Sequence, residues 1–263
     1  MKSVLESIIA NKRVEVEAAK LIISEDQIFE MARQRKREPL SISRAINGNY
    51  SGIIAEFKRR SPSKGNIHPC ADVREVVPGY EANGAAACSI ITDTRYFGGS
   101  LADLAIANQY SGIPLLRKDF MIDKYQVAES YIYGADAILL IAAVLSKEEM
   151  AGMLELAHYF GMEALVEIHS ADEVEKIPLG ADLIGVNNRN LHTFVTDVDA
   201  SFNIFPRLPK EAVKIAESGI CSHNDIHKLR TIGYSGFLIG ETFMKKDNPG
   251  SALYSFLNPN NRQ

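Results

Sequence analysis

The sequence predicts an α/β fold, a (β/α)8 TIM barrel with an N-terminal helical extension. Three observations predict it: short apolar runs recur after residue 50, segments with helical spacing separate them, and polar residues gather at the carboxyl ends of the runs. Strands that alternate with helices form a parallel sheet buried on both faces. Eight such units fit a closed barrel better than an open sheet. A doubly wound sheet is the alternative, but no G-x-G-x-x-G follows an early strand.

Composition narrows the class of protein. The 263 residues are 46% apolar and 24% charged, which is ordinary for a globular protein. A net charge of −4 gives no indication of nucleic-acid binding. The three cysteines, Cys70, Cys88 and Cys221, form no C-x-x-C and are expected as free thiols in a reducing compartment. No apolar run reaches the roughly 18–20 residues of a membrane span. We therefore expect a soluble cytoplasmic protein, with residues 1–263 in one domain.

The first fifty residues are expected to form helices that pack against the barrel. Residues 4–20 carry apolar side chains at helical spacing, and a second helical segment opens at the capping residue Ser24 and stops at Pro39. The basic residues 33–37 are interpreted as a solvated helix end, because cations favour a helix C-terminus. A nucleic-acid patch is the less favoured interpretation in an otherwise acidic chain.

The eight runs and the segments between them follow a regular order. The runs are GIIAEF (52–57), AACSIIT (86–92), PLLRK (114–118), DAILLIA (136–142), EALVEI (163–168), DLIGVN (182–187), VKIAES (213–218) and GFLIG (236–240). Helical periodicity or helix caps follow seven of them, for example in residues 123–134, 146–161 and 222–233. Residues 247–257 are expected to form a closing helix.

Polar residues at the carboxyl ends of these runs predict a functional cavity. They are Glu56, Lys58, Lys118, Glu167, Asn187, Arg189, Glu217 and Ser218. Side chains alternate along a strand, so Glu56 and Lys58 share one face. Barrel active sites lie at the carboxyl end, and charges buried there are costly unless paired or used. Ion pairs that plug the rim are the alternative. In such a cavity we expect lysine pKa values to be lowered and glutamate pKa values raised, as general acid and base chemistry requires.

The last two runs indicate a phosphate site. Gly219 and Gly240 each lie just past a strand end. The loops after the last two strands of such barrels often bind phosphate through backbone N–H groups, and glycine allows close approach of the backbone. We therefore expect a small phosphorylated substrate.

Several motifs together resemble one family. They are AEFKRRSPSKG, YFGGSLADL, LLRKDFMIDKYQV, GADAILLIAA, ALVEIHS, IGVNNRNL, AESGI and FLIGETFM, and they resemble the indole-3-glycerol-phosphate synthases from about Val4 to Phe256. The resemblance implies ring closure, decarboxylation and dehydration of 1-(2-carboxyphenylamino)-1-deoxyribulose 5-phosphate in tryptophan biosynthesis. The products are indole-3-glycerol phosphate, CO2 and water. It implies neither a cofactor nor a metal ion.

The resemblance also implies roles for the catalytic residues. Lys118 matches the general acid and Glu167 the catalytic carboxylate. Lys58 matches a second lysine near the substrate carboxylate, and which lysine acts in each step stays open. Glu56 would tune the lysines. Asn187 would orient ring closure, and Glu217 would complete the polar shell.

The binding residues follow from the same resemblance. Those implied are Ser61, Arg189, Ser218, Gly219, Gly240, Glu241, Phe97, Phe120, Leu139, Ile141, Leu191 and Leu238. Glu241 stands where some relatives carry Ser, so we expect it to offer its backbone with the side chain turned away. For Leu139 and Ile141, plain core packing is an equal alternative. Residues 61–65 are expected to form a mobile loop over the substrate.

Other interpretations stay open. A Schiff-base aldolase would use Lys58 or Lys118 as its nucleophile. A phosphometabolite-binding protein without catalysis would not need an acid and a base together. A phosphoribosylanthranilate isomerase would lack the Ser-Pro-Ser loop and Lys-Asp-Phe. His223 and His227 are assigned to a solvated helix face rather than a metal site, and His169 is left out of the predicted site. We expect a monomer without an obligate protein partner.

Overall fold

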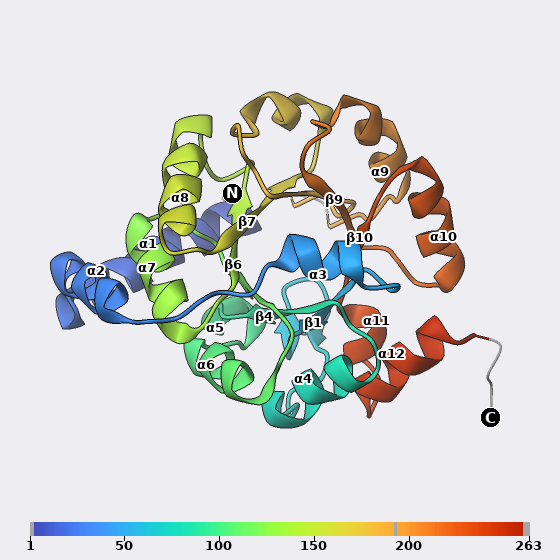
Figure 1. The fold of residues 1–263 in the computed structure, drawn as a ribbon, viewed down its shortest axis with the longest axis horizontal. Coiled ribbons are helices and arrows are strands. Elements are labelled where there is room, and N and C mark those ends of the chain that lie inside the picture. Colours follow the sequence, from blue (N-terminus) through green and yellow to red (C-terminus); the bar gives the residue numbers. More distant parts are fainter. Residues whose placement is uncertain (1–2, 192–193, 260–263) are drawn as a thin grey trace.

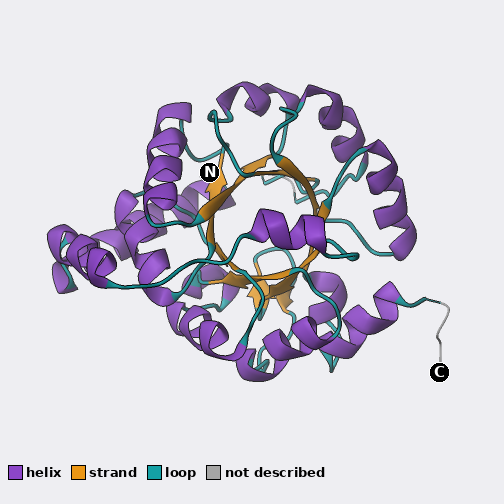
Figure 2. Cartoon of the chain, in the orientation of Figure 1, coloured by secondary structure: helices purple, strands orange, loops and turns teal. Residues whose placement is uncertain are grey.

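Eight parallel strands close into a barrel, which confirms the predicted fold. The computed structural model describes residues 3–191 and 194–259. Figure 2 views the barrel down its axis, so that the strands form a ring. Neighbouring strands pair in parallel around the ring, and β10 returns to β1. The barrel strands are β1 (Ile53–Phe57), β4 (Ala87–Ile91), β5 (Leu115–Lys118), β6 (Ala137–Ile141), β7 (Glu163–Ile168), β8 (Leu183–Asn187), β9 (Val213–Glu217) and β10 (Gly236–Ile239).

Helices form an outer layer around this ring (Figure 1). The connecting helices are α4 (Val73–Ala82), α5 (Thr94–Phe97), α6 (Leu101–Tyr110), α7 (Lys124–Tyr133), α8 (Lys147–Tyr159), α9 (Asp199–Ile204), α10 (His223–Ile232), α11 (Glu241–Met244) and α12 (Pro249–Leu257), with 3-10 turns η1 (Ala171–Lys176) and η2 (Phe205–Arg207). Side-chain caps start several of them, and Ser146 and Ser222 form capping boxes. The helices predicted after the third, fourth and seventh runs are confirmed as α7, α8 and α10.

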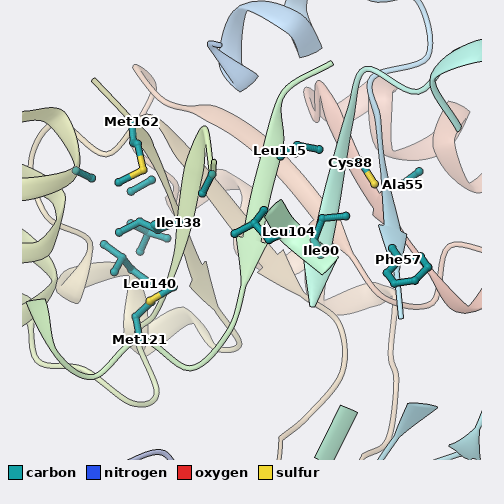
Figure 3. Close-up of a cluster of buried hydrophobic side chains, with 14 of the residues drawn as sticks. Ala55, Phe57, Cys88, Ile90, Leu104, Leu115, Met121, Ile138, Leu140 and Met162 are labelled. Carbon is teal, nitrogen blue, oxygen red and sulfur yellow. The ribbon is translucent and has the colours of Figure 1, made fainter. Parts of the chain in front are cut away.

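Alternation along the strands separates two cores. Side chains such as Ile54, Leu116 and Leu165 point inward and form one buried cluster. Their neighbours point outward and pack under the helices, as Figure 3 shows for Phe57 and Leu140 among others. Near the carboxyl end the inward positions become polar, so the same alternation that builds the core also turns the charged side chains towards the axis.

The N-terminal segment contains three helices rather than the two that were predicted. They are α1 (Val4–Ile22), α2 (Glu25–Gln34) and α3 (Ile42–Gly48). Helix α3 crosses the amino-terminal opening of the barrel (Figure 2), where Ile42 and Ile46 join the inner core. Helix α1 reaches the opposite end, where Lys12 pairs with Asp119 at 2.9 Å. The extension therefore closes one end of the barrel and braces the other.

The segment after β1 forms a small antiparallel hairpin, β2 (Arg60–Ser61) with β3 (Gly65–Asn66). The predicted loop over the site is therefore folded back on itself beside the cavity. The chain between β1 and this hairpin is anchored by Arg59, whose guanidinium donates two hydrogen bonds, at 2.7 and 2.8 Å, to the carboxylate of Asp103. In the described part of the chain, no helix combines the length and apolar character that crossing a membrane requires.

Candidate active site

A cavity of about 490 Å³ opens at the carboxyl end of the barrel. Every residue that the sequence predicted for the site lies on its wall. They are Glu56, Lys58, Ser61, Phe97, Lys118, Phe120, Leu139, Ile141, Glu167, Asn187, Arg189, Leu191, Glu217, Ser218, Gly219, Leu238, Gly240 and Glu241. Five different strands contribute the charged and amide groups. The structure thus brings the predicted residues together, and their chemical roles stay predictions.

Lys118 lies at the centre of the charged groups. Its Nζ atom is 3.6 Å from a Glu167 oxygen, 3.9 Å from a Glu56 oxygen and 4.0 Å from a Glu217 oxygen. These three carboxylates come from β7, β1 and β9, and each residue is at most 4% exposed. All three distances are longer than a hydrogen bond. We call Lys118, Glu56, Glu167 and Glu217 the Lys118 cluster.

The members of this cluster differ in the direction of their pKa shifts. Burial alone would lower the pKa of Lys118, but the carboxylates of Glu167, Glu217 and Glu56 outweigh it and raise that pKa. The expectation of a lowered lysine pKa is therefore wrong for Lys118. It took account of desolvation but not of three carboxyl groups within 4.0 Å.

The carboxylates do not share one direction of shift. Burial and the neighbouring Glu167 raise the pKa of Glu217 well above its usual range. Burial also opposes the charge of Glu167, but Lys118 and His169 lower its pKa. Glu56 follows Glu167, because Lys58 and Lys118 outweigh its burial and lower its pKa. The expectation of a raised glutamate pKa thus fits Glu217 and is wrong for the other two. Beside the same lysine, two carboxyl groups thus have a lowered pKa and one has a raised pKa.

Lys58 extends the cluster towards the hairpin. Its ammonium forms an ion pair with Glu56, two residues earlier on the same face of β1. A side chain at Gly240 would collide with this carboxylate, because its Cβ atom would lie 2.2 Å from a Glu56 oxygen. The close approach of Glu56 therefore requires a glycine at the end of β10.

Arg189 links the hairpin to the loops around it. Its guanidinium donates to Ser63 Oγ at 3.2 Å and lies 3.5 Å from a Glu241 oxygen. Lys64 of the hairpin lies 3.8 Å from the same carboxylate group. The expectation that Glu241 turns its side chain away is therefore wrong, since the carboxylate lies on the cavity wall and pairs with two cations. Asn187 accepts a hydrogen bond from the Arg189 N–H at 3.0 Å, which fixes its amide.

The backbone after β9 has an unusual geometry. Ser218 and Gly219 both have a left-handed φ, 65° and 76°. That conformation is uncommon for a serine and costs free energy unless the surroundings enforce it. Here the side-chain amide of Asn188 donates to the Ser218 carbonyl at 3.0 Å. The turn carries the chain sharply over the rim, beside the start of α11.

Apolar side chains also line the cavity. Phe97 and Phe120 face each other with ring centroids 6.1 Å apart. Leu139, Ile141 and Leu238 belong to the inner core and also line the cavity. Core packing of Leu139 and Ile141 is therefore confirmed, while their contact with a substrate ring stays a prediction. The cavity therefore combines an aromatic surface with charged groups.

Sequence reasoning missed two groups that support the site. Lys12 enters from α1 and pairs with Asp93 at 3.2 Å and with Asp119 at 2.9 Å, and both carboxylates line the cavity. No periodicity could reveal that partner, more than eighty residues away. His169 lies behind Glu167 at 3.3 Å. Its position two residues after Glu167 was a usable signal, because it places both side chains on one face. Across residues 3–191 and 194–259, no group of three His, Cys, Asp or Glu side chains is arranged to hold a metal ion.

Comparisons of fold alone find other barrels. An N-acetylmannosamine-6-phosphate 2-epimerase from Clostridium perfringens superposes with a TM-score of 0.59 at 14% identity, over 86% of this chain and 99% of that one. A thiamine phosphate pyrophosphorylase from Pyrococcus furiosus gives a TM-score of 0.56 at 15% identity, over 83% and 96%. At these identities only the fold is shared.

Comparisons of sequence are more specific. Residues 5–256 match the family model described as indole-3-glycerol phosphate synthase. Proteins of that name from Bacteroides thetaiotaomicron, Carboxydothermus hydrogenoformans and Legionella pneumophila are 51%, 44% and 40% identical to this chain. The matches cover 98%, 95% and 98% of this chain, and 98%, 97% and 99% of those proteins. With the family model matched over nearly its whole length, the chain belongs to the indole-3-glycerol phosphate synthase family.

Proposed function

We propose that the cavity around Lys118 converts 1-(2-carboxyphenylamino)-1-deoxyribulose 5-phosphate into indole-3-glycerol phosphate, CO2 and water. This is the carboxy-lyase reaction of the family, in tryptophan biosynthesis. The observation that carries the proposal is the Lys118 cluster itself, in which the Lys118 ammonium lies within 4.0 Å of Glu167, whose pKa is lowered, and of Glu217, whose pKa is raised. Such opposite shifts suit a base and an acid in one cavity.

Ring closure needs a cation at the ketone. The aromatic carbon that bears the carboxylate attacks the ketone carbon, and the Lys118 ammonium donates a proton to the oxygen as the new bond forms. Loss of CO2 then restores the aromatic ring. Asn187 holds the geometry of attack, and the neighbouring carboxylates stabilise the positive charge that develops on the ring. Phe97 and Phe120 would pack against the ring and hold it in reach.

Dehydration completes the indole. The hydroxyl group leaves with a proton from a lysine, and we assign this step to Lys58, whose ion pair with Glu56 places it beside the hairpin. A proton leaves the neighbouring carbon to the Glu167 carboxylate, and the double bond of the pyrrole ring forms. Atoms balance, since one water and one CO2 are released for each substrate.

The phosphate would bind at the opposite rim. Backbone N–H groups around Gly219 and Gly240 lie where the chain leaves β9 and β10, and both glycines line the cavity. Ser61, Ser218 and Arg189 add polar contacts. Glu241 already pairs with Arg189 and Lys64, so its negative charge is partly compensated where the phosphate would approach. We further propose a cytoplasmic monomer, for which the reaction requires no protein partner.

A Schiff-base aldolase is disfavoured by the same geometry. Its nucleophile must be an uncharged lysine nitrogen. Carboxylates around Lys118 raise its pKa and hold it protonated, which suits an acid and not a nucleophile. Reduction with borohydride in the presence of a ketose phosphate would leave a mass adduct only if the aldolase were correct.

Turnover of the carboxyphenylamino-deoxyribulose phosphate tests the proposal. Indole fluorescence reports the product, and the protein adds little background because it contains no Trp. We expect a rising signal with the wild-type protein and its loss in Lys118→Ala and Glu167→Gln. A folded wild-type protein without signal would refute the proposed function. Turnover equal to that of the wild type in both variants would refute the catalytic roles of Lys118 and Glu167 but not the proposed reaction.

A further inference from the structure

His169 is a buried histidine that the proposed reaction does not use. It follows β7 directly and lies two residues beyond Glu167, so the two side chains share a face. Its side chain is only 10% exposed, and it does not line the cavity. It therefore lies behind Glu167, where it can act on the carboxylate but cannot touch a substrate.

Two carboxylates flank the imidazole at ion-pair distance, and neither ring nitrogen makes a hydrogen bond within the described residues. Its Nε2 atom is 3.3 Å from Glu167 Oε1, and its Nδ1 atom is 3.8 Å from Glu173 Oε2. Glu173 belongs to η1, and it also accepts a hydrogen bond from the His169 backbone N–H at 2.6 Å. The imidazole thus joins an outer carboxylate to an inner one, in the order Glu173, His169, Glu167.

Charges on the neighbouring elements favour the imidazolium form. Burial lowers the pKa of His169, but Glu167 on β7 and Glu173 on η1 outweigh it and raise that pKa to about 9. Lys176, also on η1, acts on Glu173. On the inner side Glu167 faces Lys118 from β5 and Glu217 from β9. Protonated His169 is therefore the second cation beside Glu167.

The two oxygens of Glu167 have different partners. Oε1 lies against His169, while Oε2 points to Lys118 at 3.6 Å and has no hydrogen-bond partner within the described residues. One oxygen of Glu167 therefore faces the imidazole at ion-pair distance, and the other faces Lys118 in the cavity. Among the described residues Glu217 forms an ion-pair contact with Lys118 alone, at 4.0 Å, and His169 acts on it only from a greater distance.

We propose that His169 is a positioning residue, which as imidazolium holds Glu167 ionised and orients its free oxygen, so that Glu217 and not Glu167 carries the proton of the pair. The kinetic part of this inference rests on the proposed function. The electrostatic part does not, because the state of His169 can be measured without turnover.

His169→Gln tests the kinetic part, because glutamine keeps a donor but loses the charge. Without the imidazolium the Glu167 pKa rises, so we expect the acidic limb of the kcat/KM profile to move about one unit higher, since one pKa unit is a tenfold change in the ionised fraction. Because the pKa of Glu167 lies below its ordinary value in the wild-type protein, the loss should approach tenfold only at the acidic end of the profile and should be small at neutral pH. Glu173→Gln should move the limb in the same direction by less.

His158→Gln is the matched control. His158 also pairs with a carboxylate, Asp182, at 2.9 Å, but it lies on α8 outside the cavity lining. It should leave the profile unchanged. A His169→Gln profile of unchanged shape, or a loss equal at every pH, would overturn the proposal, since a purely structural role predicts one or the other.

NMR titration of the six histidines in the wild-type protein keeps the proposal testable even if the variants fail to fold. We expect one imidazole to titrate near pH 9, and Glu167→Gln to lower that pKa. Six pKa values near 6.5, the ordinary value for histidine, would overturn the inference. Because the titration needs no turnover, its failure is distinguishable from failure of the proposed function.

Discussion

Two buried charged clusters lie side by side at the carboxyl end of this barrel, and consecutive residues of one strand supply them. Lys118 points inward to the Lys118 cluster. Arg117 and Asp119 belong to the other, which with Lys12 and Thr92 we call the Arg117 cluster. Both combine cations and carboxylates at very low exposure. They differ in how fully their polar atoms are paired.

The Arg117 cluster is closed. All three guanidinium nitrogens of Arg117 have partners, among them Thr92 Oγ1, Ser130 Oγ and Asp119 Oδ2 at 3.1 Å each. Each oxygen of Asp119 accepts from a hydrogen-bond donor and faces a cation: Oδ1 accepts from the Phe120 N–H at 2.8 Å and pairs with Lys12, while Oδ2 accepts from Thr92 and Arg117. A buried polar network in which every member is satisfied fixes its surroundings.

The Lys118 cluster is open. One ammonium faces three carboxylates at distances beyond a hydrogen bond. One oxygen of Glu167 and both oxygens of Glu217 are buried without a hydrogen-bond partner in the described residues. Such groups cost stability, and they persist where function requires them. The difference teaches that pairing, rather than charge or burial, separates a supporting cluster from one prepared for a substrate.

Lys118→Met should show the largest effect, which is a loss of turnover with little loss of stability. We expect turnover to fall by about 10²–10⁴, the range for a general acid. The stability of Lys118→Met should fall less than that of Lys12→Met. Glu167 still faces His169, Glu56 still pairs with Lys58, and the raised pKa of Glu217 favours its uncharged form. Steady-state kinetics and urea unfolding of the same sample measure both. A stability loss that accounts for the lost turnover would make this cluster structural.

Lys12→Met should instead cause a large loss of stability. Removal of one partner from a buried charge network costs about 3–5 kcal/mol of unfolding free energy, because Asp93 and Asp119 stay buried without it. Lys20→Met is the matched control on the same helix, since Lys20 pairs with the partly exposed Asp123 at 2.6 Å. Urea unfolding should show at most about 1 kcal/mol there. Equal losses in the two variants would contradict a special role for Lys12.

The Arg117 cluster should lose its ion pairs only at low pH, when Asp119 becomes protonated. Burial opposes the charge of Asp119, but Arg117 and Lys12 outweigh it and lower its pKa from 3.8 to about 2. A carboxylate with a depressed pKa stabilises the fold above its unfolded-state pKa. We therefore expect Asp119 to contribute about 2–3 kcal/mol near pH 5 that is lost as the pH falls from about 4 to 2. Comparison of the stability curves of wild type and Asp119→Asn measures this, and parallel curves would refute it.

Glu217→Gln should give the smallest effect and the opposite sign. A carboxyl group whose folded pKa is raised favours folding only below its unfolded value near 4.5, and this contribution is lost as the pH rises through the folded pKa. Its replacement should therefore raise stability near pH 8, and this gain should shrink on acidification. Glu56→Gln is the counterpart, because its lowered pKa predicts destabilisation instead. Destabilisation by both would show that Glu217 is not strained.

The sequence predicted the Lys118 cluster better than the Arg117 cluster. Strand alternation was enough to turn Glu56, Lys118 and Glu167 inward, and the barrel fold brings their strand ends together. Lys12 looked like any lysine on a helix, because its partners come from distant loops that local patterns do not place. Helix α3 was missed for a related reason. Its seven residues show too little periodicity, and its stability comes from covering the open end of the barrel.

The direction of the pKa shifts also lay beyond the sequence. Composition of the site predicted titratable groups but not the distances between them, and those distances decide whether desolvation or attraction prevails at Lys118. The same holds for Glu241, whose carboxylate was expected to avoid the site. Two cations on the hairpin and on the loop after β8 draw it in, and neither was predictable as its partner.

A crystal structure with bound indole-3-glycerol phosphate would test most directly that this cavity is where ring closure takes place. We expect the phosphate oxygens within about 2.7–3.2 Å of backbone N–H groups at Gly219 and after Gly240, as hydrogen bonds require. The indole ring should lie against Phe97 and Phe120, with Lys118 and Glu167 next to its five-membered part. Product bound elsewhere, or with its ring outside the cavity, would contradict the proposed site.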